Sequence, residues 1–580
     1  MLYLKLNDIY IFIKLQKKNL MRVAEYISNL LKKKNSVKSI FMLTGYGAMY
    51  LNDAIKKSGI KYYATRNEAT APIMAEAYSR ISGKIGVACV TAGPGATNAI
   101  PGLAEAYVDS APILVISGQV DYKQTTNSTK LKDIRTFGTA EIDIIPIVKP
   151  LTKYCQILKN PNDVDYVFNK AIDTATSGRP GPVWIDIPLN VQRSKINLSK
   201  LKKYKKKKKE LIKKEDLNKI LKSLYASKRP LIICGGGIKS SNTFKILKKI
   251  INLKNIPTFF SRAASDLCSH DDKFIFGLAG IKGSRYCKKI MMESDLVIGL
   301  GCRFSPQLVG HEFDVFKKAK VIAIDITKNE MKKKGIRIDI KINSDLKFFM
   351  PLLLQNLKQN KNIKNFNLWN DYCEKIRDQL NINQIIKKKN PIDLYYFMQK
   401  IGELSKKGSI LVTDAGSNYY AGGQVWKFNK NQKEIASVTN AAMGLSIPLA
   451  IGSAIADPSK QVIAVTGDGS IELNIQELKT ISHYKLNIKL FVINNGGYLS
   501  MHNWADTFFK GRRVDNAEDT GDGTLNFKKI ADAFDLIYRR ISDYKKIELD
   551  FKKIIKIKGP VLIEVMTDNK QKIFDAFNDY

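Results

Sequence analysis

Two apolar runs of this 580-residue sequence end in polar residues that stand among glycines. The first run closes as VTGDGS, which places Asp468 between Gly467 and Gly469, and the second closes as VINNGG, which places Asn495 before two glycines. One carboxylate oxygen, one carboxamide oxygen and a backbone carbonyl suit a hard cation, because Mg²⁺ takes oxygen ligands and commonly shares those of a diphosphate. The two run ends therefore predict a metal–diphosphate site.

The expected order of elements around these residues supports the same interpretation. Ligands of an open parallel sheet gather beyond the carboxyl ends of its strands, so Asp468 and Asn495 would meet there if their runs form adjacent strands. Ser470 is expected to open a helix, whose free N–H groups favour an anion. Gly467 and Gly469 would let the backbone approach the ligand closely.

Three other glycine clusters carry weaker signals. CGGGIKS contains Gly235–Gly237, GLGCRF contains Arg303, and each follows a strand-like run. Either cluster fits a phosphate-binding turn, or an ordinary tight turn between strand and helix, which needs glycine as well. In TAGPGATNAI (Thr91–Ile100) a Gly-Pro-Gly turn opens a predicted helix, and both interpretations stay open there too.

Strand-like and helix-like segments alternate along the chain in three blocks. This alternation predicts an α/β fold of three consecutive domains with mostly parallel sheets. The β-rich runs are SIFMLTG, KIGVACVTAGPG, APILVISGQ and GPVWIDIP in the first block, PLIICGGGI, IPTFFS, DLVIGLGCRF and KVIAIDIT in the second, and SILVTDAG, VIAVTGDGS, IKLFVINNGG and PVLIEVMTD in the third.

Shifts in composition suggest where the domains end. The run KKYKKKKKE and the Asn/Lys-rich stretch QNLKQNKNIKNFNLWNDY resemble connecting segments, and Met21 opens a clearer helical pattern than Met1 does. We therefore expect translation to start at Met21, or residues 1–20 to be dispensable. The expected segments are an N-terminal extension at 1–20, a first domain at 21–195, a Lys-rich linker at 196–215, a central domain at 216–355, a connector at 356–390 and a last domain at 391–580.

Composition argues against several classes of protein. The formal net charge is +41, but the excess is lysine spread along the chain without a base-stacking or recognition motif, so we predict no nucleic-acid partner. No apolar run reaches the roughly 18 residues that span a bilayer, so we predict no membrane segment. Seven Cys without a C-x-x-C pair and four His without metal-ligand spacing fit a reducing cytoplasm rather than disulfide or zinc frameworks.

Together the motifs resemble the thiamine diphosphate-dependent enzymes of the acetohydroxyacid (acetolactate) synthase and pyruvate decarboxylase superfamily. GDGS followed by Asn495 is similar to their cofactor signature. RNEATAPIMAEAYSRISGKIGVACVTAGPGATNAI resembles their pyrimidine-binding domain, DLVIGLGCRF with VIAIDI resembles their central Rossmann-like domain, and NAAMGLSIPLAIGSAIA resembles the segment before GDGS in their diphosphate-binding domain. The resemblance covers nearly the whole chain and includes acetolactate synthase large subunits.

The resemblance implies thiamine diphosphate and Mg²⁺ as cofactors. It makes Asp468, Asn495 and the carbonyl of Gly497 the metal ligands, and it makes Glu68 of RNEAT the catalytic carboxyl that hydrogen-bonds the pyrimidine ring of the cofactor. A partly buried carboxyl suits proton exchange with that ring. The implied cofactor-binding residues are Met443, which matches the apolar residue that bends the cofactor, and Gly416, Ser417, Gly467, Gly469 and Ser470.

Two short segments depart from the acetohydroxyacid synthase pattern. Those enzymes usually have Phe-Gln-Glu where this chain has TAE (Thr139–Glu141) and Pro-Lys-Asp where it has PLN (Pro188–Asn190). Thr139, Ala140 and Leu189 would therefore leave the acceptor pocket roomier and without a cation, which weakens the case for an acceptor that carries a carboxylate. The segment TGYGAMYLNDAI also resembles a subgroup of these enzymes linked to surface-sugar biosynthesis.

The predicted function is that of an acetolactate synthase-like carboligase. It would decarboxylate a 2-keto acid, pyruvate first, and transfer the two-carbon acyl unit to a ketone acceptor. One alternative is acetyl transfer to a keto-sugar nucleotide in surface-polysaccharide biosynthesis, and another is simple decarboxylation. A catalytically silent protein of the same fold is a further alternative, against which Glu68, Asp468 and Asn495 argue.

The resemblance also bears on other cofactors and on assembly. Acetohydroxyacid synthases hold a non-redox FAD in the central domain and many relatives do not, so FAD is left open, with Gly235–Gly237, Arg303 and Asp325 as the residues to contact it. A homodimer or homotetramer with active sites between subunits is implied. A regulatory small subunit is also left open.

Overall fold

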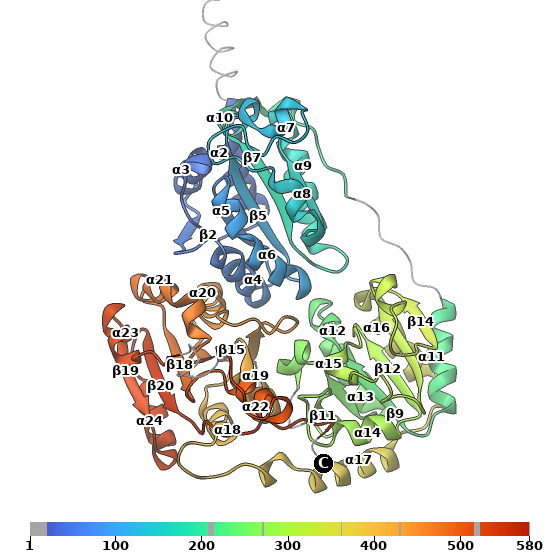
Figure 1. The fold of residues 1–580 in the computed structure, drawn as a ribbon. Coiled ribbons are helices and arrows are strands. Elements are labelled where there is room, and N and C mark those ends of the chain that lie inside the picture. The colour runs from blue at the N-terminus through green and yellow to red at the C-terminus, as the bar shows by residue number, and fades with distance from the viewer. Residues whose placement is uncertain are drawn as a thin grey trace, which may run out of the picture. The chain divides into compact units, whose positions relative to one another are not determined.

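The computed structural model describes residues 20–206, 214–268, 272–360, 362–428, 431–515 and 523–578. Most of the predicted extension, residues 1–19, and the middle of the Lys-rich linker, residues 207–213, lie outside them. The described chain contains three six-stranded sheets in which all paired strands run parallel, and Figure 1 shows helices on both faces of each. The predicted fold of three α/β domains with mostly parallel sheets is therefore confirmed.

The chain divides into two compact units. One consists of residues 1–208 together with 447–459 and 474–486 and holds the first sheet, and the other holds the second and third sheets. Within the first unit, the strand order is β3-β2-β4-β5-β7-β6. These strands are β2 (Ser39–Met42), β3 (Lys61–Ala64), β4 (Gly86–Val90), β5 (Ile113–Gln119), β6 (Tyr154–Ile157) and β7 (Val183–Pro188).

Helices cover both faces of the first sheet. Ile40 and Met42 share a core with one set of helices, whereas Phe41, which points to the opposite face of the same strand, packs on Tyr78 of α4. Burial on both faces explains why these strands are nearly continuous apolar runs. The helices are α2 (Val23–Asn29), α3 (Met49–Ser58), α4 (Thr70–Ser82), α5 (Pro94–Asn98), α6 (Ile100–Val108), α7 (Thr126–Thr129), α8 (Ile144–Val148), α9 (Val164–Thr176) and α10 (Leu189–Arg193), with a short antiparallel pair of β1 (Leu20–Arg22) and β8 (Lys195–Asn197).

The second sheet forms the centre of the middle domain, in the order β11-β10-β9-β12-β13-β14. Among its helices, α17 falls within the segment 356–390 that was expected to be a connector. Trp369, Cys373 and Ile376 lie on one face of α17 and are buried in the central core, so this polar-looking segment contains an amphipathic helix. The elements are β9 (Pro230–Cys234), β10 (Thr258–Phe260), β11 (Ile275–Leu278), β12 (Leu296–Leu300), β13 (Lys320–Asp325), β14 (Ile340–Asn343), α11 (Lys214–Ala226), α12 (Gly236–Ser240), α13 (Phe244–Lys254), α14 (Cys287–Glu293), α15 (Pro306–Val309), α16 (Leu346–Gln359) and α17 (Asn367–Gln379).

The third sheet has the order β16-β15-β17-β18-β20-β19. In all three sheets the sequence predicted the four inner strands and missed the two edge strands, namely β3 and β6, β11 and β14, and β16 and β19. The elements of this part of the chain are β15 (Ile410–Thr413), β16 (Lys433–Ala436), β17 (Val462–Gly467), β18 (Ile488–Asn494), β19 (Ile537–Ile541), β20 (Val561–Met566), α18 (Leu394–Leu404), α19 (Gly416–Val425), α20 (Ser446–Ala456), α21 (Leu478–His483), α22 (Leu499–Phe508), α23 (Phe527–Ala533) and α24 (Ile547–Ile554).

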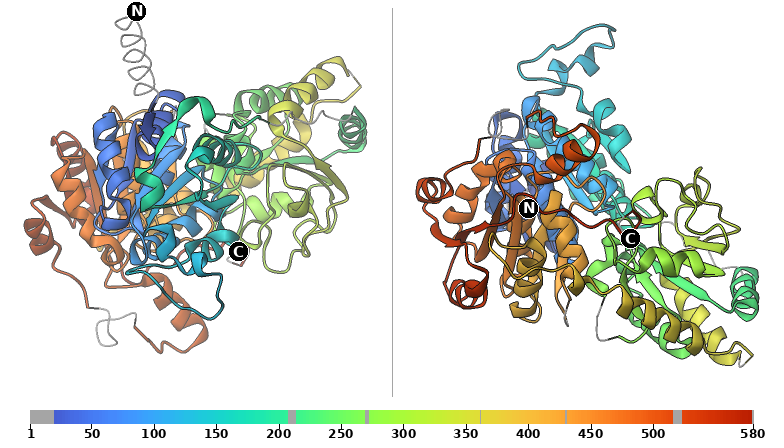
Figure 2. Two further views of the ribbon diagram at one scale, coloured as in Figure 1. Left: turned by 90° about the horizontal axis from the view of Figure 1, so that it is seen from above. Right: turned by 60° about the horizontal axis from the view of Figure 1, so that its bottom comes forward.

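After β20 the chain crosses to the central domain, as the dark red segment in the right view of Figure 2 shows. The Ala576 N–H donates to the carbonyl of Ile281 at 2.7 Å, and the Lys288 ammonium donates to the carbonyl of Phe577 at 2.5 Å. Ala576 and Phe577 are themselves buried members of the central core. We call residues 573–578 the C-terminal strap.

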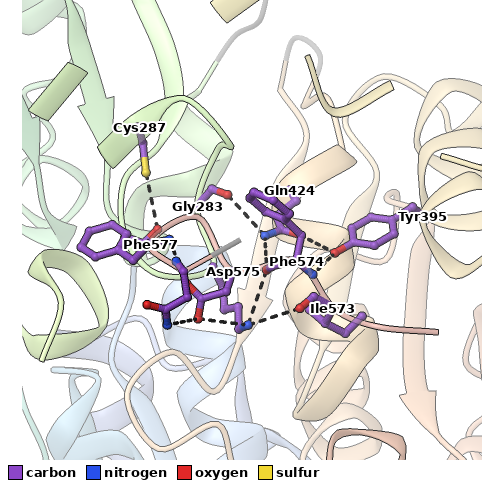
Figure 3. Close-up of polar contacts among 11 residues, drawn as sticks. Gly283, Cys287, Tyr395, Gln424, Ile573, Phe574, Asp575 and Phe577 are labelled. Atoms are coloured by element: carbon purple, nitrogen blue, oxygen red, sulfur yellow. Dashed lines mark hydrogen bonds and ion pairs between the residues drawn. The ribbon is translucent and has the colours of Figure 1, made fainter. Parts of the chain in front are cut away.

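The strap is also fastened to the third domain, and Figure 3 shows these contacts. The Phe574 N–H donates to the Tyr395 hydroxyl at 2.9 Å, and the Gln424 amide donates to the carbonyls of both Phe574 (3.1 Å) and Gly283 (3.3 Å). Gln424 therefore links the strap and the central domain to helix α19.

Phe577→Ala should destabilise the central domain. The ring is 9% exposed, and it lies so close to Gly310 that a Cβ on that glycine would come within 2.9 Å of it. Removing a buried Phe ring costs about 3 kcal/mol, which should appear as a lower midpoint in urea unfolding followed by tryptophan fluorescence. The exposed neighbour Asn578→Ala is the control, and equal midpoints for both variants would contradict a core role for the strap.

Candidate functional site

Three adjacent strands of the third sheet end in polar residues at one edge. Asp414 follows β15, Asp468 follows β17 and Asn495 follows β18, and these strands are neighbours in the order β15-β17-β18. The two predicted metal ligands therefore meet at the carboxyl edge of a parallel sheet, as expected. Asp414 was missed, although its apolar run SILVTDAG ends in a carboxylate in the same way.

The Asp468 carboxylate joins the two predicted loops. It is buried, one oxygen accepts the Gly469 N–H at 3.0 Å, and the other accepts the N–H groups of Asn495 (2.9 Å) and Gly497 (3.0 Å). Gly496 and Gly497 have φ values of +74° and +108°, which side-chain-bearing residues rarely adopt. The glycines thus let the second loop fold back onto the carboxylate.

The side chain of Asn495 supplies an independent sign of a ligand. It is 5% exposed, and its Oδ1 atom is buried without a hydrogen-bond partner among the described residues. A buried amide oxygen without a partner costs about 1–3 kcal/mol unless something occupies it. Together with the Asp468 carboxylate and a glycine carbonyl, it fits a hard cation such as Mg²⁺. No group of three or more His, Cys, Asp or Glu suited to a metal occurs in the described residues, so the donor set differs from that of a zinc site.

Ser470 connects three turns around this loop. Its hydroxyl donates to Asp414 at 2.7 Å and accepts the Gly444 N–H at 2.8 Å, while Thr466 donates to the same Asp414 oxygen at 2.8 Å. Burial raises the pKa of Asp414 above its usual value, although the hydrogen bonds from Ser470, the Ala415 N–H and Thr466 oppose the shift. The hydroxyl of Ser470 is therefore engaged within the protein, so any contact with an anion would have to come from its backbone N–H.

One expectation about this loop needs correction, and one glycine has a close neighbour within the protein. Ser470 is followed by a 3₁₀ segment, Ile471–Glu477, with a break at Asn474, and the α-helix α21 begins only at Leu478. Gly469 is required by a neighbour, because a Cβ there would come within 2.2 Å of the Tyr498 ring. At Gly467 the nearest atom to a Cβ is 3.8 Å away, so that glycine does leave open space.

The remaining predicted cofactor residues lie on two turns of the same unit. Gly416, with φ +76°, and the buried Ser417 open the ten-residue helix α19, whose N-terminus is electropositive. Met443 is half-buried and directly precedes Gly444, which Ser470 holds. These residues, Asp468 and Asn495 all belong to the second compact unit.

Glu68 belongs to the first unit, in the segment just before α4. Its carboxylate is half-buried and accepts from the Asn98 amide at 3.2 Å. A Cβ on Gly95 would lie 3.3 Å from the other carboxylate oxygen, so the Gly-Pro-Gly turn of TAGPGATNAI packs beside Glu68. The turn, which sequence patterns left open between two interpretations, thus adjoins the predicted catalytic carboxyl.

Glu477, at the end of GDGSIELNIQE, was not predicted and fixes the segment that carries Glu68. It is fully buried, and one oxygen accepts from the Arg66 N–H and the Thr70 hydroxyl, both at 2.7 Å. The other oxygen accepts from the Thr480 hydroxyl at 2.6 Å. Its position, nine residues after Asp468, carried no signal that sequence patterns alone identify.

The central glycine cluster is explained by packing. A Cβ on Gly235 would come within 2.0 Å of the Gly301 carbonyl oxygen, and one on Gly237 within 2.6 Å of the Gly301 Cα. Arg303 donates to the Thr439 hydroxyl at 2.9 Å, and Asp325 accepts the Thr327 N–H at 2.7 Å. These contacts offer no separate support for a flavin.

Comparison with known proteins gives the family. Models of the thiamine pyrophosphate enzymes match the chain in three places: the N-terminal TPP binding domain at residues 21–143, the central domain at 217–356 and the C-terminal TPP binding domain at 414–565. The chain therefore belongs to the thiamine pyrophosphate enzymes.

Similarity to individual proteins shows which type of thiamine pyrophosphate enzyme the chain is. The acetolactate synthase large subunit of Lactococcus lactis is 33% identical over 550 residues, which cover 93% of this chain and 92% of that protein. That of Porphyra purpurea is 32% identical over 519 residues (88% and 85%), and a probable acetolactate synthase large subunit of Methanococcus aeolicus is 29% identical over 559 residues (92% and 90%). The protein is thus an enzyme of the thiamine pyrophosphate-dependent acetolactate synthase type. Each helix within the described ranges is either too short or too polar to span a bilayer.

Glu477→Gln should loosen the segment that carries Glu68. An amide has a single acceptor oxygen, so its NH₂ group would face the Thr480 hydroxyl, which would have to reverse and accept. The bonds from Arg66 and Thr70 would also lose the strength that a charged acceptor gives them. We expect a loss of about 1–3 kcal/mol in unfolding free energy, measured by urea denaturation. Gln476→Ala, a change at the half-buried neighbour, is the control; equal losses in both variants would contradict the anchoring role.

Proposed function

We propose that this enzyme uses thiamine diphosphate and Mg²⁺ to decarboxylate a 2-keto acid, pyruvate first, and to transfer the two-carbon acyl unit to a ketone acceptor. The observation that carries the metal part is the buried, unpartnered Asn495 Oδ1 beside the loop that Asp468 holds. When bound, the cofactor supplies an electron sink for the carbon from which CO₂ leaves.

The residues of this chain would divide the binding work. The metal would be held by Asp468, Asn495 and the Gly497 carbonyl. The diphosphate would face the backbone N–H groups of Gly416, Ser417, Gly469 and Ser470, and Gly467 would leave room for it. Met443 would pack against the cofactor. Glu68 would hold a proton on the cofactor's pyrimidine ring. A half-buried carboxyl with one amide partner keeps an oxygen available for that exchange.

The acceptor is proposed to be a second 2-keto acid, as in the acetolactate synthase-like role. Acetyl transfer to a keto-sugar nucleotide, an acceptor without a carboxylate anchor, is the alternative, and the following residues favour it. Leu189, where acetohydroxyacid synthases usually have lysine, is buried at the start of α10 and brings no cation to that position. Thr139 and Ala140 are exposed and small. A carboxylate acceptor would normally be met by a cation with charge-assisted hydrogen bonds.

Product analysis tests the proposal directly. Purified protein with thiamine diphosphate and Mg²⁺ is given pyruvate alone and pyruvate with candidate ketones, and CO₂ and product masses are recorded. Acetolactate from pyruvate alone supports the acetolactate synthase role, whereas product that requires a keto-sugar nucleotide supports the second acceptor. Acetaldehyde alone identifies a simple decarboxylase, and no CO₂ from any 2-keto acid refutes the function.

The family resemblance and the composition also bear on oligomeric state, cellular location and FAD. A homodimer or homotetramer with shared active sites is proposed because the family resemblance places the cofactor between subunits. Analytical ultracentrifugation measures the oligomeric state.

A cytoplasmic location is proposed from the seven unpaired cysteines, of which six are buried. For FAD the described residues add no support, and the visible absorption of the purified enzyme decides it.

Glu68→Gln should nearly abolish turnover while leaving the fold intact. An amide keeps the size of the side chain but cannot hold and release the proton, and removing a general acid or base costs about a hundredfold or more. The measurement is exchange of the cofactor's C2 proton for deuterium by NMR, with Mg²⁺ binding as the control for an intact metal loop. Exchange at near-wild-type rates would show that Glu68 has another role.

Asn495→Ala should weaken Mg²⁺ binding. The substitution removes the amide oxygen assigned to the metal, and we expect the dissociation constant for Mg²⁺ with thiamine diphosphate to rise about tenfold, or about 1.4 kcal/mol, in calorimetry. Asn487→Ala, just before the other end of β18, is the matched control, because that amide oxygen accepts from the Lys489 ammonium at 2.9 Å. Equal effects of the two variants would count against the assigned ligand.

A further inference from the structure

The turn beside Glu68 has a second neighbour. Gly93 has φ +53°, and a Cβ on it would come within 2.3 Å of the carbonyl oxygen of Ala140. The same turn approaches Glu68 through Gly95. The backbone of the TAE segment therefore packs on the turn that adjoins the predicted catalytic carboxyl.

The three residues of TAE differ sharply in exposure. Thr139 and Ala140 are exposed, and Ala140 has φ +57°, which residues with a side chain rarely adopt. Glu141, which follows directly, is 2% exposed. An unfavourable backbone conformation persists only where surrounding contacts hold it, and the contacts of the adjacent Glu141 are among those that hold Thr139 and Ala140.

Those contacts lie within one loop. The Glu141 carboxylate accepts from the N–H (3.1 Å) and hydroxyl (2.9 Å) of Thr126 through one oxygen, and from the Phe137 N–H (3.2 Å) through the other. The Thr136 hydroxyl donates to the Glu141 carbonyl at 3.2 Å. The buried carboxylate of Glu141 thus forms hydrogen bonds with both ends of residues 126–137.

A second fastening lies just beyond Glu141. The Gln119 amide, at the end of β5, donates to the Ile142 carbonyl at 2.9 Å and to Asp186 at 3.3 Å. Asp186 also accepts from the Ser117 hydroxyl at 2.5 Å, and burial raises its pKa to about 7. The chain on the far side of the TAE segment is therefore fixed to the sheet. Within residues 126–140, Asn127 is also attached, since it donates to Asp143 at 3.2 Å and accepts from Lys159 at 2.9 Å. Glu141 holds the two ends at Thr126 and Phe137.

We propose that Glu141 is a positioning residue that holds the exposed Thr139 and Ala140 beside the Glu68 turn and so sets which ketone accepts the acyl unit. The inference rests on the proposed function for its substrate, since Thr139 and Ala140 are assigned to the acceptor pocket. Glu141 has no contact with the reacting atoms in this assignment. It acts through the loop, so its loss should affect the acceptor step rather than decarboxylation.

Two variants of Glu141, which remove one or both of its attachments, separate decarboxylation from transfer to the acceptor. Glu141→Ala removes both attachments, whereas Glu141→Gln keeps one acceptor oxygen and can hold either Thr126 or Phe137. Donor turnover is followed with ferricyanide, which oxidises the two-carbon unit left after decarboxylation to acetate and needs no acceptor. The acceptor step is followed with pyruvate as the probe, as the ratio of acetolactate to acetaldehyde.

We expect Glu141→Ala to lower the acetolactate-to-acetaldehyde ratio about tenfold or more, because misplacing substrate-facing groups by an ångström has effects of that size. Glu141→Gln should fall between Ala and the wild type, and the ferricyanide rate should stay within about twofold. Parallel loss of both rates, or an unchanged ratio, would overturn the positioning role.

Asp165→Ala is the matched control for lost burial. Asp165 is another buried carboxylate of the first unit, on α9, where it accepts from the Tyr26 hydroxyl at 2.5 Å. This variant should lower thermal stability and leave the product ratio unchanged. If the acetolactate-to-acetaldehyde ratio falls equally in Asp165→Ala, the effect of Glu141→Ala would be explained by lost stability, and the proposal would be refuted.

Amide hydrogen exchange gives a readout that needs no activity. The Thr126 and Phe137 amides should exchange about tenfold or more faster in Glu141→Ala than in the wild type, because each loses its acceptor. Unchanged exchange would refute the proposal by itself. Wild-type protein that consumes no pyruvate with ferricyanide would instead refute the proposed function, and the exchange result would still decide whether Glu141 holds the loop.

Discussion

Three backbone N–H groups from two loops converge on the carboxylate of Asp468, and the candidate site depends on this convergence. A carboxylate has room for several donors at once, so one side chain can fix two strand ends in a defined relation. Asn495 and Gly497 are thereby held in place by the protein itself, as the proposed metal site would require. Preorganised ligands lower the cost of binding, because the loop does not have to be ordered at that moment.

The sequence reveals the inner part of each sheet and not its margins. Inner strands are covered on both faces and paired on both sides, so they appear as continuous apolar runs such as VIAVTG. Edge strands pair on one side only. β3 (KYYA) and β19 (IYRRI) are half-exposed and rich in tyrosine and charge, which hides them among loops. The helix α17 was hidden in a similar way by its polar outer face.

Within the site, the same distinction separates predictable residues from the rest. Asp468 and Asn495 interrupt apolar runs, so their chemistry is visible in the local sequence. Glu477 and Glu141 act on backbone groups that lie far away in the sequence or around a loop, and their partners emerge only in three dimensions. Gly469 adds a contact that the sequence did not indicate, because a Cβ there would come within 2.2 Å of the Tyr498 ring. Local sequence patterns therefore identify the residues proposed to face a ligand more readily than they identify the residues that hold the site in place.

The C-terminal strap has a consequence for how the chain reaches its final form. Domains usually fold in order as the chain emerges during synthesis. Here Ala576 and Phe577 belong to the core of the central domain, although nearly the whole third domain separates them from it in the sequence. That core stays incomplete until Ala576 and Phe577 have been translated and have left the ribosome. The central domain therefore closes only after most of the third domain has been made, and a chain cut before Ala576 leaves that earlier domain without part of its core.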